Sequence, residues 1–238
     1  MAIETKELEG GRIRLGRIEM DYRHRDETLT SVYPLAHQGY FQRVMGNITA
    51  RKLLRPTTAQ TFSLIDFALN NPDSQECKDI ISIVNYEGLW TATENLWGDK
   101  DVIIYDNVDG KMPTDRKSLI KRMKDGDKSV RVAPYQFKSR GSQSISDFVT
   151  NPFIIGQVGD GDFAEEVVAR VAKRISTLKP NVLNFLPYAC LLLPIVDTHT
   201  FTLITSKDEY SKYGLTINSD RNAACMGCAS GVVKKRRR

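Results

Sequence analysis

The strongest constraint on the fold is a regular apolar stripe between residues 163 and 178. Its members recur at helical spacing: Phe163, Val167, Val168, Val171, Ile175 and Leu178. This spacing predicts an amphipathic helix with one buried side, and Pro180 ends it because proline does not continue a helix. Since one helix cannot bury its own stripe, the rest of the chain has to provide a surface for it.

Strand patterns occur on both sides of this helix. Polar and apolar residues alternate over residues 12–20, which predicts a strand, and a slip at Gly16-Arg17 predicts a bulge or a bend in it. Short apolar runs between turn residues predict further strands at residues 102–105, 129–133, 182–185, 191–196, 201–205 and 215–217. The strands are therefore spread along the whole chain.

Three further helices are predicted from capping signals. One opens at residues 56–58 and stops at residues 70–72, a second follows Ser74, and a third follows Asp115. Helices and strands mix without a regular βαβ period. The predicted fold class is therefore α+β, with a mixed sheet and several short helices.

We expect a single domain over residues 1–233, with a candidate boundary near residues 138–146. Two Leu-Trp pairs, Leu89-Trp90 and Leu96-Trp97, recur seven residues apart. If the neighbouring glycines bound a helix, both pairs share one of its faces. That face is either core or an exposed aromatic binding surface.

The net charge of the chain resides in a basic C-terminal tail. Its five residues carry +5, the formal net charge of the whole chain: Lys234, Lys235, Arg236, Arg237 and Arg238. Consecutive cations cannot build a core, so we expect a disordered tail. Such a tail attracts polyanions, serves as a localisation signal or aids solubility.

A second basic segment, residues 116–140, holds nine basic and two acidic side chains, and it follows an acidic segment. In one interpretation the two segments neutralise each other within the fold. In the other, cations contact phosphates and aromatic rings stack on bases. The candidate nucleic-acid-binding residues are Lys117, Lys121, Arg122, Lys124, Arg131, Tyr135, Lys138 and Arg140.

The sequence predicts an intracellular, cytoplasmic protein without a membrane segment. The first residues are charged and include no apolar signal segment. The longest apolar stretch, residues 182–196, is short for a bilayer span and is interrupted by prolines. Four scattered cysteines do not form a disulfide framework, which indicates a reducing compartment.

Cys225 and Cys228 have the spacing of a metal or redox pair and are the candidate metal ligands. A structural zinc site needs four ligands, and there is no second such pair. Cys77, Cys190 and His199 can complete a site only through tertiary proximity. The alternative is that this segment of small side chains allows close packing.

Asp197 and His199 are the candidate catalytic residues, with Cys190 as the neighbouring thiol. Strand alternation places Asp197 and His199 on one side, where a carboxylate can orient an imidazole. Asp160 and Asp162 form an acidic pair of the kind that holds a divalent cation, although Asp162 also fits a helix N-cap. No motif identifies a cofactor.

Parts of the chain resemble uncharacterised archaeal proteins. The resemblance rests on residues 129–138 (Ser-Val-Arg-Val-Ala-Pro-Tyr-Gln-Phe-Lys), residues 151–155 (Asn-Pro-Phe-Ile-Ile) and the helix at 163–172, and it extends upstream to residues 55–59. It covers about residues 55–172. It implies an intracellular protein and no particular chemistry.

These observations lead us to expect a non-enzymatic binding protein. Its partner is another protein or nucleic acid, contacted through the basic segment and the tail. The alternative is a metal- or Cys/His-dependent hydrolase or transferase that uses Asp197 and His199 with Cys190, or with Asp160 and Asp162. The sequence leaves the oligomeric state open.

Overall fold

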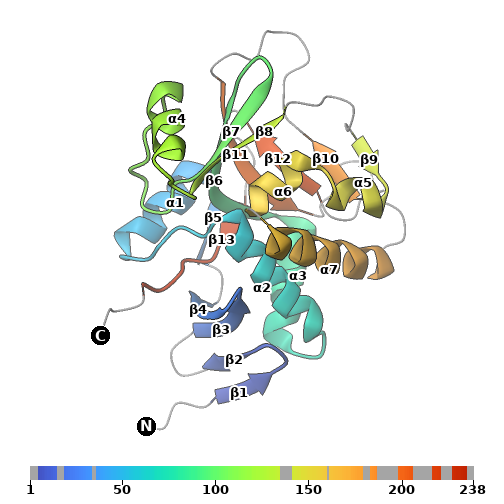
Figure 1. The fold of residues 1–238 in the computed structure, drawn as a ribbon. Coiled ribbons are helices and arrows are strands. Elements are labelled where there is room, and N and C mark those ends of the chain that lie inside the picture. The colour runs from blue at the N-terminus through green and yellow to red at the C-terminus, as the bar shows by residue number, and fades with distance from the viewer. Residues whose placement is uncertain are drawn as a thin grey trace.

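The computed structural model describes residues 5–14, 19–33, 36–134, 141–159, 161–178, 183–186, 198–205, 216–220 and 227–234 (Figure 1). Its strands are β1 (Thr5–Leu8), β2 (Gly11–Arg14), β3 (Glu19–His24), β4 (Glu27–Val32), β5 (Ala36–Gly39), β6 (Leu89–Trp97), β7 (Asp101–Asp106), β8 (Val130–Pro134), β9 (Gly141–Gln143), β10 (Leu183–Leu186), β11 (Thr198–Thr205), β12 (Thr216–Asp220) and β13 (Gly227–Ala229). Its helices are α1 (Phe41–Ala50), α2 (Thr58–Asn70), α3 (Gln75–Tyr86), α4 (Arg116–Lys124), α5 (Ile145–Val149), α6 (Pro152–Val158) and α7 (Asp162–Leu178). The predicted α+β class is confirmed.

The first four strands form an antiparallel sheet in the order β1-β2-β3-β4. The prediction of a single strand over residues 12–20, with a bulge or a bend, is wrong, because β2 and β3 are two paired strands with Ile13 opposite Met20. Directly opposed residues of a hairpin point to the same face. The apolar pattern therefore looks the same as that of a single strand. Both side chains are buried against α2 together with Tyr22 and Phe67.

A second, larger sheet has β6 at its centre. Strand β11 pairs along one edge of β6, and the other edge is shared between β13 and β7. The β10–β12 and β6–β13 pairs are parallel, whereas most neighbours are antiparallel, so the sheet is mixed as predicted. Every residue of β6 is buried.

The Leu-Trp segment, for which the sequence analysis considered a helix between the flanking glycines, is this central strand. Trp90 and Trp97 are fully buried, so the pairs belong to the core. The β-branched side chains of Thr91 and Thr93 favour an extended backbone. Because β6 is covered on both faces, the usual alternation of polar and apolar residues is missing from its sequence.

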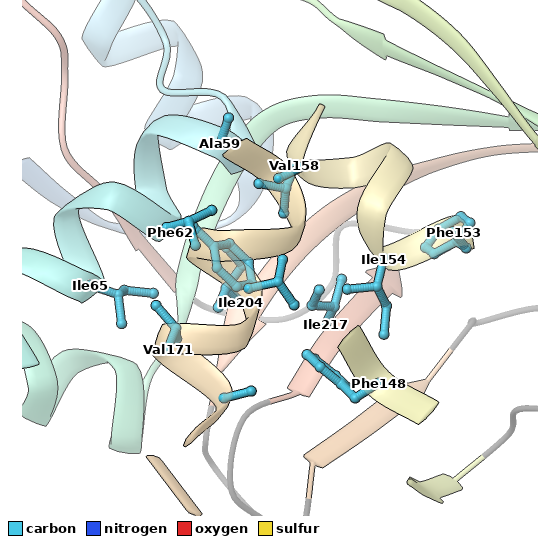
Figure 2. Close-up of a cluster of buried hydrophobic side chains, with 14 of the residues drawn as sticks. Ala59, Phe62, Ile65, Phe148, Phe153, Ile154, Val158, Val171, Ile204 and Ile217 are labelled. Carbon is cyan, nitrogen blue, oxygen red and sulfur yellow. The ribbon is translucent and has the colours of Figure 1, made fainter. Parts of the chain in front are cut away.

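Helices cover both faces of the larger sheet. On one face, α2, α6 and α7 enclose the largest core cluster, in which Phe62, Ile154 and Val171 meet Ile204 and Ile217 of the sheet (Figure 2). The opposite face carries α1, which packs around Trp90, and α4, whose Leu119 packs with Leu96 and Tyr105. None of the helices in the described part of the chain is long and apolar enough to cross a bilayer.

Local capping signals set the helix starts. Thr57 and Gln60 form a complete capping box at α2, and the Asp115 carboxylate accepts the Ser118 N–H at α4, 2.9 Å away. Ser74 precedes α3 as predicted, but its hydroxyl donates to the Glu76 carboxylate and caps no backbone group. The helix α7 already includes Asp162, the residue predicted as its N-cap.

The C-terminal segment joins the two sheets. Val232 and Leu54 exchange two backbone hydrogen bonds of 2.9 and 2.8 Å, and the Val233 N–H donates to Thr30 of β4 at 2.8 Å. The chain is therefore part of the fold up to Val233. The tail begins at Lys234, which is exposed.

The amphipathic stripe of α7 gives a direct test of the core. Val171 is 0% exposed, so Val171→Asp would bury a carboxylate without a partner and should lower the free energy of unfolding by about 3 kcal/mol or more. Denaturant unfolding followed by circular dichroism measures the change. Lys173→Asp, on the exposed side of the same helix, is the control and should cost far less. Equal losses in the two variants would contradict the assigned core face.

Candidate functional site

Helix α4 presents a row of lysines to solvent. Lys117, Lys121, Lys124 and Lys128 are spaced by three or four residues, and all four are exposed. Lys117, Lys121 and Lys124 share one side of α4, with about 10 Å between the first and the third, and Lys128 lies in the turn that follows the helix. The other side of α4 packs on the sheet through Leu119. We call these four residues the lysine stripe.

No ammonium group of the lysine stripe is in an ion pair with another described residue. The nearby carboxylates Asp101 and Asp127 are instead bound by Arg116 and Arg122, at 2.6 and 2.8 Å. The lysine charges therefore face solvent without an internal partner. This arrangement supplies a one-sided cationic surface of the kind that contacts phosphates.

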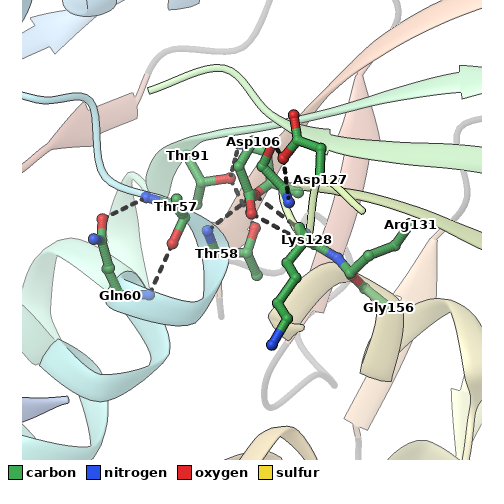
Figure 3. A network of polar contacts seen from close by, with 11 residues as sticks. Thr57, Thr58, Gln60, Thr91, Asp106, Asp127, Lys128, Arg131 and Gly156 are labelled. Atoms are coloured by element: carbon green, nitrogen blue, oxygen red, sulfur yellow. Dashed lines mark hydrogen bonds and ion pairs between the residues drawn. The ribbon is translucent and has the colours of Figure 1, made fainter. Parts of the chain in front are cut away.

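Arg131, predicted to contact nucleic acid, is used inside the fold. Its side chain is only 7% exposed, and its guanidinium forms an ion pair with Asp106 at 2.8 Å (Figure 3). The Nε–H donates to the Gly156 carbonyl of α6 at 2.7 Å. The guanidinium therefore cannot reach a phosphate outside the protein. The remaining predicted residues lie outside the described residues: Tyr135, Lys138, Arg140, Lys235, Arg236, Arg237 and Arg238.

The Arg131–Asp106 pair belongs to a larger polar junction. Asp106 also accepts the hydroxyl of Thr93 at 2.7 Å, and Thr93 Oγ1 accepts the Thr58 N–H at the start of α2. The junction thus connects β6, β7 and β8 with α2 and α6 (Figure 3). Breaking it should affect several elements at once.

Replacing Arg131 tests this structural role. Arg131→Met leaves the Asp106 carboxylate without its cation and should destabilise the protein by about 3–5 kcal/mol, as expected for one partner of a buried pair. Arg116→Met is the matched control, because the Arg116–Asp101 pair is about one-third exposed on both sides and should contribute about 0–1 kcal/mol. Chemical denaturation of both variants measures the difference. Equal losses would argue against a structural role for Arg131.

His199, predicted as catalytic, lies in β11 and contacts a buried acid through a tyrosine. The Tyr105 hydroxyl is 2.8 Å from Glu94 Oε2 and 3.1 Å from His199 Nδ1. Burial, with Glu94 as a second cause, raises the pKa of Tyr105 above its usual value, so the phenol keeps its proton. It donates that proton to Glu94 and accepts from His199 Nδ1–H. The Nε2 atom of His199 is left as a proton acceptor.

Sequence patterns do not point to Tyr105 or Glu94. They predict that Asp197 orients His199, but Asp197 and Cys190 lie outside the described residues. Glu94 is 5% exposed and also accepts from the Asn107 side chain at 2.9 Å. In the sequence, Glu94 stands out only as an acidic residue inside an otherwise uncharged segment. This indicates a buried acid only once the segment is known to be a buried strand.

Of the two predicted metal ligands, the structure describes Cys228 but not Cys225. Cys228 is buried in β13 and donates its thiol hydrogen to Glu87 at 3.0 Å. Burial and the Glu87 carboxylate raise the pKa of the Cys228 thiol to about 12, which disfavours the thiolate that a metal requires.

Cys225 and Asp160 are outside the described residues, and Asp162 is in the first turn of α7. Among the described side chains, no group of three or more His, Cys, Asp or Glu is placed to hold a metal ion.

The His199 contact predicts one tautomer of the imidazole. At pH values where the ring is neutral, the proton should be on Nδ1, and ¹⁵N NMR should show Nε2 as the unprotonated nitrogen. Tyr105→Phe removes the acceptor for Nδ1–H and should shift the population toward the Nε2–H tautomer. An Nε2-protonated ring in the unmodified protein would contradict the proposed direction of the hydrogen bonds.

Comparison with known proteins identifies the fold. No protein-family model matches the chain, and no curated protein matches it in sequence. A solved structure, described as "Accommodation of massive sequence variation in Nanoarchaeota by the C-type lectin fold", aligns with a TM-score of 0.55 and 13% sequence identity. The alignment covers 89% of this chain and 100% of the other. At this identity the likeness concerns the fold alone: the chain resembles a C-type lectin fold, and an archaeal neighbour is consistent with the archaeal resemblance of the sequence.

Proposed function

We propose that this chain is a binding protein built on a scaffold similar to the C-type lectin fold, and that it contacts a polyanionic macromolecule through the lysine stripe of α4. The proposal rests on a difference between the arginines and the lysines around α4. Arg116, Arg122 and Arg131 are bound by carboxylates, whereas the lysines on the outer side of α4 are not. Nucleic acid is the first polyanion to test.

The architecture is compatible with such a role. Helix α4 is anchored by Leu119 and by the Arg116–Asp101 pair, so its backbone holds the stripe in place. The structural neighbour is described as a C-type lectin fold that accommodates massive sequence variation. A scaffold of this kind can change its surface while its core is preserved, which suits a binding protein. Lys234, the first residue of the basic tail, follows Val233, whose N–H donates to Thr30 of β4.

The salt dependence of binding tests the lysine stripe. The triple change Lys117→Ala, Lys121→Ala and Lys124→Ala lowers the formal net charge from +5 to +2. If all three lysines contact phosphates, the slope of log K against log salt concentration should decrease in magnitude by about 3 for duplex DNA. Fluorescence anisotropy with a labelled duplex at several salt concentrations gives this slope.

The matched control is the triple change Lys78→Ala, Lys100→Ala and Lys111→Ala, which alters the net charge equally at exposed positions outside the stripe. Its slope should stay close to that of the unmodified protein. Deletion of residues 234–238 measures the contribution of the tail separately. If the stripe variant and the control bind alike, and only the deletion weakens binding, the stripe is not the contact surface.

An enzyme is the second candidate, favoured by the chain of contacts from Glu94 through Tyr105 to His199. A fixed imidazole with an unprotonated Nε2 can act as a general base. A hydrolase or transferase needs in addition a nucleophile or a metal, for which Cys190 or the Asp160–Asp162 pair was predicted. Binding has the more direct support, since the stripe needs no further group to act.

A further inference from the structure

A cavity of about 530 Å³ lies where the turns of the N-terminal sheet meet α2 and α7. This volume is within the range of small-molecule sites. Four carboxylates and three guanidinium groups line it, so its charged groups sum to −1. The cavity is distant in sequence from both the lysine stripe and His199, and the proposed function does not use it.

The walls of the cavity are held in place by specific contacts. His24 Nδ1 is 2.9 Å from the Ser63 hydroxyl of α2, and the His24 ring meets the edge of Phe163 of α7 with 5.2 Å between centroids. The Arg25 guanidinium lies over the same Phe163 ring, 5.1 Å from its centroid. The β3–β4 turn is thereby fixed on both helices, which gives the cavity a defined shape before any ligand binds.

Two lining residues of α2 carry acceptor atoms without donors. Asp66 Oδ1 and Asn70 Oδ1 are both buried and have no hydrogen-bond partner among the residues that the structure describes. An unsatisfied buried acceptor costs about 1–3 kcal/mol, and more if it is charged. The two residues are four positions apart on one helix, so their side chains are neighbours. A single donor group placed between them can bond to both.

The other oxygen of Asp66 already binds a guanidinium. Arg170 of α7 donates Nε–H to Asp66 Oδ2 at 3.1 Å, and its Nη1 is 3.7 Å from Glu166. The Arg170 side chain is 47% exposed, and pairs of this kind contribute little to stability. Arg170 can therefore leave Asp66 at low cost. The position it vacates is shaped for a cationic group with N–H donors.

We propose that this cavity binds a small organic cation, an amine or a guanidine, whose donors bond to Asp66 and Asn70 in place of Arg170. The net negative lining favours a cation, and the two acceptors require N–H groups. The mixed charge of the rim also accommodates a ligand with an additional anionic group, which the guanidinium of Arg23 or Arg25 can bind, since neither is in an ion pair with a described residue.

Titration with agmatine, which carries one guanidinium and one ammonium group, tests the proposal on the full chain. Isothermal calorimetry should detect binding, and the side-chain amide signals of Asn70 should shift in NMR spectra. Arg170→Gln removes the internal competitor and should tighten binding several-fold. Asp66→Asn should weaken it at least tenfold, and Asn70→Ala should weaken it less.

The control is Asp73→Asn, an exposed carboxylate close to the end of α2 that lies outside the cavity and should leave binding unchanged. Circular dichroism verifies that each variant is folded. The proposal fails if agmatine produces neither heat nor an Asn70 shift even with Arg170→Gln, or if Asp73→Asn weakens binding as much as Asp66→Asn. It also fails if the Asn70 amide group donates to Asp66 and its NMR signals do not shift with agmatine. Binding of inorganic phosphate in the cavity without binding of agmatine would equally contradict it.

Discussion

The structure depends on the satisfaction of polar side chains along β6, the strand buried on both faces. Asn95 donates to Thr202 at 3.1 Å, Thr202 donates to Gln157 at 2.8 Å, and Gln157 donates back to Asn95, which closes a ring between β6, β11 and α6. Thr91 lies 2.9 Å from the hydroxyl of Thr58 at the start of α2. Each unsatisfied group would cost about 1–3 kcal/mol, so these contacts fix the position of both helices on the sheet.

This constraint determines where function can be located. Because helices cover both faces of the larger sheet, its centre is closed, and the accessible features lie at the periphery. One is the outer side of α4 with the lysine stripe. Another is the cavity where the turns of the N-terminal sheet meet α2 and α7.

In the described part of the basic segment, arginines and lysines lie in different environments because their side chains differ in chemistry. Planar guanidinium groups form well-directed pairs with carboxylates and tolerate burial, as Arg131 does with Asp106. Ammonium groups are strongly hydrated and stay in water, as Lys117 and Lys121 do. In the described part of the segment, Arg116, Arg122 and Arg131 pair with carboxylates of the fold, as the first sequence-based interpretation expects. Contact of the lysines with a partner, which the second interpretation expects, stays a prediction.

The sequence by itself determined the elements with local signals. These were α7 from its apolar stripe, α2 and α4 from their caps, and the α+β class from the mixture of periods. It could not determine β6, whose nine buried residues lack alternation because the covering helices come from distant parts of the chain. The partners of His199 and Arg131 were equally hidden, since Tyr105 and Asp106 reach them only through strand pairing. Tertiary structure decided these contacts, because burial and hydrogen-bond satisfaction are properties of groups far apart in sequence.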